Sequence, residues 1–232
     1  MVNFKKVAKW FAGGIAGVIA LSGAYYQGLI RKPSYQQLPP AVQRSIDEQE
    51  HLLEATLQDA VNDYKSGDLS SCQKKLKEAI TLVVPLAKHS EQYTLIEDKL
   101  YRYQDILTAT KHAQESLNTN RVFLDNLEAQ LTSTQIAGVF QWTAHPQSIE
   151  ALYYTYTQPQ VINDPLMAKA LLAMYIQMME EYLSLTIALR EKLEKAAVAD
   201  EIKTAMKKIN GVIESLTRHL GDIKKEFEGL GK

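Results

Sequence analysis

Residues 202–227, IKTAMKKINGVIESLTRHLGDIKKEF, carry the most regular pattern in the chain. Their apolar residues recur at spacings of four and three over more than three heptads, so they lie on one face of a helix. This heptad face consists of Ile202, Met206, Ile209, Ile213, Leu216, Leu220, Ile223 and Phe227. Such a face packs against a second helix, either in an antiparallel bundle within the chain or in a second chain. The spacing leaves both alternatives open.

Helical spacing also dominates the sequence before this stretch. Gly and Pro are scarce, at 11 and 7 of the 232 residues. We predict helices over about residues 41–65, from Asp68 or Ser70 to Pro85, from about 93 to 118–120, over 124–131 and from Pro165 to about 189. The predicted fold class is therefore all-α, with an N-terminal transmembrane helix followed by a helical bundle with coiled-coil-like C-terminal helices.

Changes in composition divide the chain into six segments. They are a short basic N-terminus (1–9), a transmembrane helix (10–30), a linker (31–40), helical hairpins (41–131), an aromatic loop region with a short helix (132–164) and long C-terminal helices (165–229). The aromatic region is predicted to be the least helical part, apart from the brief run IEALYYTYT.

The predicted membrane segment is WFAGGIAGVIALSGAYYQGLI, residues 10–30, which holds 21 residues without a charge. At a rise of about 1.5 Å per residue it spans about 30 Å, enough to cross the hydrocarbon core of a bilayer. Aromatic residues lie at both of its ends, as at membrane interfaces. Small residues on one face predict close packing with another membrane helix, or reflect the usual composition of such helices. These residues are Ala12, Gly13, Ala16, Gly17 and Ala20.

A cleaved signal peptide is the alternative for the same segment. Residues 1–9 are basic, Phe11–Leu21 are apolar, and Ser22–Ala24 provide small residues for cleavage. We favour a retained anchor, because the apolar run continues to Ile30 and ends at two further basic residues. The positive charges before the segment outnumber those after it, which favours a cytoplasmic N-terminus and a body on the periplasmic, lumenal or extracellular side.

Charge is distributed unevenly along the chain. Residues 1–32 hold five basic residues and no acidic ones, which leaves 21 basic against 27 acidic residues in the body. A mildly acidic body without a basic stripe argues against nucleic acid as the main partner. We therefore expect the partners to be the lipid bilayer and one or more proteins bound through helical packing, with a homo-oligomer as one form.

No group of residues predicts catalysis, a cofactor site or a metal site. Cys72 is the only cysteine and lies at a helical core position, where a small buried hydrophobe is expected. Glu48 and His51 have the spacing of a metal-binding pair on one helix face, but the sequence has no second copy. Adjacent Glu180 and Glu181 diverge by about 100° on a helix, so at most one faces a core. We predict that the chain is not an enzyme.

One stretch resembles a single degenerate tetratricopeptide unit. The residues that carry the resemblance are Ala60, Gly67–Asp68, Leu76, Ala79 and Pro85. The resemblance covers about 30 residues. Its proline stands one place late and no second copy follows, so we predict no repeat array, because stacked repeats need neighbours.

The aromatic residues of segment 132–164 are the predicted protein interface. They are Phe140, Trp142, Tyr153, Tyr154 and Tyr156. The three tyrosines lie within four positions of a helix and cannot all face one core, and Trp and Tyr dominate interface hot spots. The alternative is that Phe140 and Trp142 fold back to cover the end of the bundle.

Together these patterns predict a membrane-anchored helical scaffold, tether or accessory subunit of a membrane-associated protein complex. The first alternative is a secreted or periplasmic helical binding or chaperone-like protein after signal cleavage. The second is a membrane bundle that senses a ligand.

Overall fold

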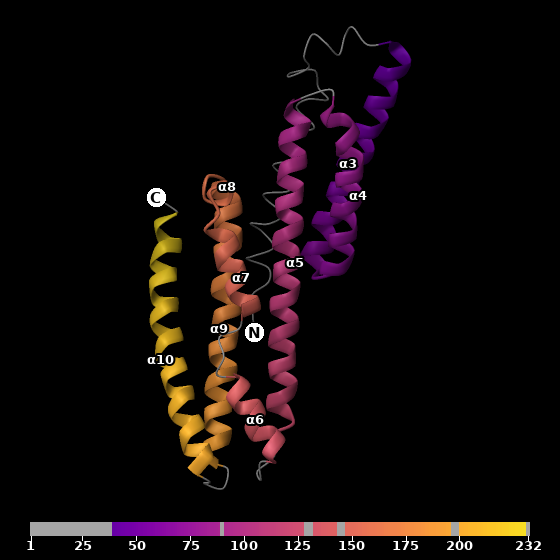
Figure 1. The fold of residues 1–232 in the computed structure, drawn as a ribbon. Coiled ribbons are helices and arrows are strands. Elements are labelled where there is room, and N and C mark those ends of the chain that lie inside the picture. Colours follow the sequence, from indigo (N-terminus) through magenta and orange to yellow (C-terminus); the bar gives the residue numbers. More distant parts are fainter. Residues whose placement is uncertain (1–38, 89–90, 128–131, 143–146, 196–199, 231–232) are drawn as a thin grey trace. The chain divides into compact units, whose positions relative to one another are not determined.

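The computed structural model describes residues 39–88, 91–127, 132–142, 147–195 and 200–230 (Figure 1). These residues form helices and turns without a strand, so the prediction of an all-α chain is confirmed for them. The predicted transmembrane helix, residues 10–30, and its small-residue face lie outside the described residues. Among the described helices, none combines the length and the apolar composition that a membrane crossing requires.

The described helices follow one another along the chain with short connections. They are α3 (Pro40–Ser66), α4 (Leu69–Ala87), α5 (Glu91–Asp125), α6 (Ser133–Trp142), α7 (Gln147–Tyr156), α8 (Pro159–Ile162), α9 (Pro165–Lys195) and α10 (Asp200–Gly229). They belong to two compact units, which divide between Thr108 and Ala109 within α5. We call them the N-terminal unit and the C-terminal unit.

The turn between α3 and α4 is set by two neighbouring residues. Gly67 adopts a left-handed conformation with φ of 86°, which glycine reaches at little cost, and its N–H donates to the last turn of α3. Of the two predicted caps for α4, Asp68 is the one observed, because its carboxylate accepts a hydrogen bond of 2.9 Å from the Ser71 N–H. Pro85 lies inside α4 near its end.

The core of the N-terminal unit combines aliphatic side chains with tyrosines from α3, α4 and the first part of α5. Its fully buried members include Leu53, Leu57, Tyr64, Cys72, Leu76, Val83, Tyr93, Ile96, Leu100 and Tyr103. The Tyr93 hydroxyl donates to the buried carboxylate of Glu50, which joins α5 to α3. The side-chain amide of Gln73 on α4 donates to the Thr108 hydroxyl at 2.9 Å.

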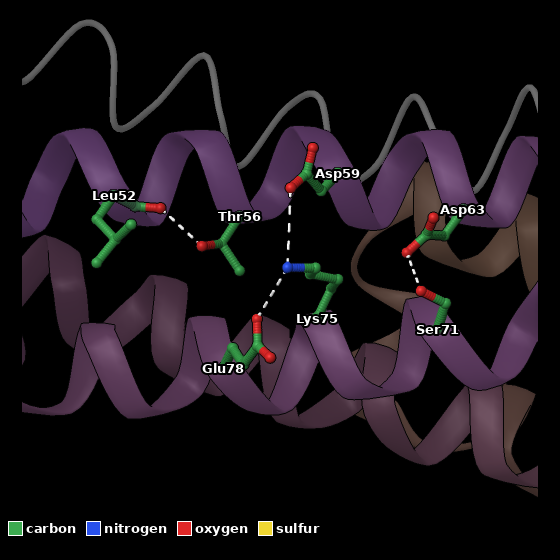
Figure 2. Close-up of polar contacts among 7 residues, drawn as sticks. All are labelled: Leu52, Thr56, Asp59, Asp63, Ser71, Lys75 and Glu78. Atoms are coloured by element: carbon green, nitrogen blue, oxygen red, sulfur yellow. Dashed lines mark hydrogen bonds and ion pairs between the residues drawn. The ribbon is translucent and has the colours of Figure 1, made fainter.

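Polar contacts cross the surface between α3 and α4 (Figure 2). The Lys75 ammonium lies between the carboxylates of Asp59 at 3.8 Å and Glu78 at 3.1 Å. The Ser71 hydroxyl donates to Asp63 across the turn at 2.6 Å. Exposed ion pairs of this kind contribute little stability, about 0–1 kcal/mol, so the buried side chains hold the helix pair together.

Helix α5 continues through the segment where a break was predicted. The sequence Asn118-Thr119-Asn120 suggested a helix end, with a separate helix over 124–131. In the structure the Thr119 hydroxyl donates to the Glu115 carbonyl at 2.9 Å, and Asn118 accepts from Arg121 at 3.0 Å. Both side chains bond within their own helix, and α5 runs to Asp125.

The C-terminal unit is organised around α9. This helix contacts α7, α8 and α10, and α10 also touches α6. Figure 1 shows α9 and α10 side by side over most of their lengths. On the heptad face, Ile202, Ile209, Leu216, Leu220 and Ile223 are buried. The heptad face therefore packs within the chain, against α9, which is one of the two alternatives left open by its spacing.

Candidate functional site

The five predicted interface residues occupy different environments in the C-terminal unit. Trp142 and Tyr156 are buried, with exposed fractions of 5% and 4%, whereas Tyr154 is 72% exposed. Phe140 and Tyr153 are partly buried, and the Lys208 ammonium lies 5.1 Å from the centre of the Phe140 ring. Tyr154 is thus the most accessible of the five, and binding of a partner at these residues stays a prediction.

Trp142 ends α6 and is fixed in the core by two hydrogen bonds. Its indole N–H donates to the Thr186 hydroxyl at 3.1 Å, and its carbonyl oxygen accepts from the Tyr182 hydroxyl at 2.6 Å. The Trp142 and Tyr182 rings are stacked with their centres 6.3 Å apart, and the Phe123 ring lies 5.9 Å from Trp142. The structure thus places Trp142 at the junction of α5, α6 and α9.

A second aromatic cluster joins α7, α9 and α10. The Tyr153 ring lies within 6 Å of three other rings, centre to centre: Tyr156 at 5.7 Å, Tyr175 at 5.1 Å and His219 at 5.8 Å. The Tyr175 hydroxyl and His219 Nε2 share a hydrogen bond of 2.7 Å, and the Tyr156 hydroxyl donates to Glu226 at 2.7 Å. These bonds connect α9 and α7 to the polar residues His219 and Glu226 of α10.

The hydroxyls of this cluster stay protonated well beyond neutral pH. Burial raises the pKa of Tyr156, and its hydrogen bond to the Glu226 carboxylate raises it further. Burial likewise raises the pKa of Tyr175, with a smaller effect from the Glu150 charge. Neutral, hydrogen-bonded phenols of this kind position helices; a phenol that acts as a base needs a lowered pKa.

Next to Trp142 the C-terminal unit contains a cavity of about 550 Å³. Its aromatic wall is formed by Phe123, Trp142 and Tyr182. The polar residues that line it are Ser116, Thr119, Asn120, Gln141, Gln147 and Ser148, and Gly138 completes the lining. Apart from Gly138, the lining residues among those the structure describes carry hydroxyl, amide or aromatic groups and no charge. This volume lies within the range of small-molecule sites, about 300–1,000 Å³.

The cavity and the tyrosine cluster could not be found from sequence alone. Their members are separated by up to several tens of residues; Tyr175 and His219 are 44 residues apart. No spacing rule connects such positions, so the sequence does not predict that Tyr175 and His219 meet. Within the described residues, no group of three or more His, Cys, Asp or Glu side chains is arranged to hold a metal ion.

The structure places Cys72 in the core and both Glu180 and Glu181 in ion pairs. Burial raises the pKa of the Cys72 thiol to about 12, and the charges of Asp63 and Asp68 add to the shift. A thiol of this kind is not activated as a nucleophile. Glu180 pairs with Lys224 at 2.7 Å, and Glu181 pairs with Arg121.

Comparison with known proteins gives no family assignment. No protein-family model, curated protein or solved structure matches this chain.

Proposed function

We propose that this chain is a membrane-anchored helical scaffold or tether, acting as an accessory subunit of a membrane-associated protein complex. The observation that carries the proposal is the uncharged 21-residue segment 10–30, with basic residues on both sides, followed by two helical units. The anchor would fix the chain at a bilayer, and the units would present helix surfaces to a protein partner.

The surface around α7 and α8 is where we expect that partner. Tyr154 at 72% exposure, Ile162 at 47% and Leu166 at 43% are large apolar side chains exposed within residues 154–166. Single exposed apolar residues are common, whereas contiguous apolar patches mark contact surfaces, and these three residues lie close in sequence on α7, α8 and the start of α9. Tyr154 also belongs to the residue types that are enriched at interface hot spots.

Two measurements test the anchor separately from the partner. Extraction of membranes with alkaline carbonate should leave the protein in the membrane pellet, and its intact mass should include residues 1–24. Release into the supernatant, or a mass that begins near Tyr25, would contradict the anchor and favour the secreted or periplasmic alternative. Purification from detergent-solubilised membranes should then recover a protein in constant ratio to the chain.

One observation favours a second candidate function, a membrane bundle that binds a ligand. The cavity beside Trp142 has the size of a small-molecule site and a lining that combines aromatic and hydrogen-bonding groups. A scaffold needs no such cavity. Stoichiometric recovery of a small molecule and no protein with the solubilised chain would support this second function over the first.

A further inference from the structure

One side of α4 carries lysines and no acidic residue. It consists of exposed residues at spacings of four and three: Ser70, Lys74, Lys77, Thr81, Val84 and Lys88. We call it the lysine face. It lies opposite the side of α4 that packs in the core through Cys72, Leu76 and Val83. We propose that the lysine face binds the anionic headgroups of the bilayer that holds the anchor, so this inference rests on the membrane role proposed above and deepens it.

The lysines of this face are separated from a neighbour of the same type. Lys75 points toward α3 and lies between two carboxylates, which neutralise its charge (Figure 2). In the sequence Lys75 and Glu78 stand within the run, so no basic stripe is apparent there. Among the residues that the structure describes, no ion pair engages Lys74, Lys77 or Lys88. Three ammonium groups on one helix face are therefore left to solvent or to an external anion.

The charge of this face differs from that of the body around it. The body holds 27 acidic against 21 basic residues, yet none of the six positions of the lysine face is acidic. Solvated helix faces usually mix both signs, because opposite charges three or four positions apart stabilise a helix. The lysine face gains nothing of this kind along its own length, which favours a negatively charged surface outside the unit as its counterpart.

The chain brings this face within reach of a bilayer. Nine residues separate Ile30, the end of the predicted membrane segment, from Pro40 at the start of α3, and nine residues reach at most about 32 Å. Helix α3 has 27 residues and α4 has 19, and α4 turns back beside α3 toward its start (Figure 1). The Lys88 end of the lysine face therefore lies toward the end of α3 to which the linker attaches.

Anionic headgroups attract lysines strongly enough for this docking. Each lysine near an anionic bilayer favours binding about fivefold. Three lysines act on the same surface, and the anchor makes their binding intramolecular, so a weak intrinsic affinity suffices. Val84, which is 37% exposed, adds an apolar contact with the interfacial layer. High salt should oppose the docking, because it screens exposed charges.

The test reconstitutes the full chain into vesicles of phosphatidylcholine, with or without about 30% of the anionic lipid phosphatidylglycerol. A membrane-impermeant amine reagent labels the exposed lysines, and mass spectrometry gives the rate at each position. Lys65, exposed on α3 outside the lysine face, is the internal reference. Relative to Lys65, labelling of Lys74, Lys77 and Lys88 should be slowed about threefold or more by phosphatidylglycerol, and about 0.5 M NaCl should restore it.

Matched variants separate the lysine face from net charge. Lys74→Gln combined with Lys77→Gln removes two of the three charges, so in phosphatidylglycerol vesicles Lys88 should label as it does in phosphatidylcholine alone. Lys207→Gln combined with Lys225→Gln removes the same charge from exposed positions of α10 and should leave the lysine face slowed. Unchanged melting temperatures would show that both variants fold. Equal effects of the two variants would contradict the proposal, because they would reflect net charge.

Flotation of the chain with phosphatidylcholine vesicles tests the anchor itself. A chain that does not float overturns both the anchor and the docking. A chain that floats but labels equally in both lipids, or slows as much at Lys65, keeps the anchor and ends the docking proposal. Slowing in native membranes but not in protein-free vesicles would assign the lysine face to an acidic protein in place of lipid and would likewise end it.

Discussion

Both units of this chain contain long-range side-chain bonds, such as Tyr93 to Glu50 in the N-terminal unit, but a local turn joins the first two helices of that unit. In the N-terminal unit the α3–α4 turn is set by Gly67 and Asp68, which act on residues within the adjacent turns. In the C-terminal unit the bonds from Trp142 to Thr186 and from Tyr175 to His219 each join residues 44 positions apart. Local signals in the sequence therefore determine the α3–α4 turn, whereas only the folded chain brings together these contacts of the C-terminal unit.

The two units also differ in the features that they offer for stability and for binding. The core of the N-terminal unit contains a thiol with a raised pKa, aliphatic side chains, buried tyrosines and the buried Glu50 carboxylate. The C-terminal unit holds a cavity with an aromatic wall, a tyrosine–histidine cluster and the exposed Tyr154. The features on which the proposed binding of a protein partner or a small-molecule ligand rests thus lie in the C-terminal unit.

The largest expected effect is the loss of the C-terminal unit through Leu216→Asp. Leu216 is 1% exposed on α10, so a carboxylate there enters the packed face without a partner and should cost about 4 kcal/mol of unfolding free energy. Ile213→Asp is the matched control, because Ile213 is only partly buried and should cost clearly less. Urea unfolding measures both.

Hydrogen exchange on the same variant tests the division into units. We expect amide protection to fall in α9 and α10 while α3 and α4 keep theirs. Equal losses in all four helices would show that the units do not unfold separately. Equal costs for the two substitutions would show that α10 does not present Leu216 to α9.

The next effect is loss of stability in the N-terminal unit at alkaline pH. The folded Cys72 thiol keeps its proton up to a pKa of about 12, whereas the unfolded thiol ionises near 9.0. The unfolded state therefore binds fewer protons between these values, and stability falls as pH rises through this window. Exchange protection of α3 and α4 should fall between pH 9 and 10 in the wild type and fall less in Cys72→Ala. An identical pH dependence in both proteins would contradict this assignment.

Removing single hydrogen bonds, one long-range and one local, should have a smaller effect on the free energy of unfolding. Tyr182→Phe leaves the buried Trp142 carbonyl without its donor and should cost about 1.5 kcal/mol. Asp68→Ala removes the cap of α4 and should cost about 1 kcal/mol. Chemical unfolding gives both values, and only Tyr182→Phe should shift the emission of Trp142. A shift of equal size in Asp68→Ala would contradict the local character of the cap.

Periodicity and turn chemistry could predict the helices, since both act over a few residues. A helix end near Gly67 and a cap at Asp68 or Ser70 follow from residue type, and the heptad face of α10 follows from its spacing. The hydrogen bond from the Ser71 N–H decides for Asp68. The continuation of α5 could not be predicted, because Asn118 and Thr119 suit both a helix end and a helix surface. Their bonds to Arg121 and Glu115 decide between the two.

In the aromatic region, residues 132–164, the sequence predicts neither the helices nor the burial of each aromatic residue. Segment 132–164 was predicted as mostly loop, yet the structure contains α6, α7 and α8 there. The spacing of the tyrosines required some exposure, and Tyr154 is exposed. Tyr156 is buried and Tyr153 is partly buried because they contact Glu226 and Tyr175, respectively. The spacing of the tyrosines does not place these two residues nearby.

The smallest expected effect on stability belongs to Tyr154→Ser, and for this reason it tests the interface most clearly. Tyr154 is 72% exposed, so its loss should change unfolding free energy by no more than about 0.5 kcal/mol. Tyr156→Ser, two positions away, removes a buried ring and the bond to Glu226 and should cost about 3 kcal/mol. If the surface of α7 binds a partner, Tyr154→Ser should lose the protein recovered from solubilised membranes while its melting temperature stays that of the wild type. Recovery of the partner at the wild-type ratio would show that this surface is not the interface, because the fold would be intact and only the exposed ring would be missing.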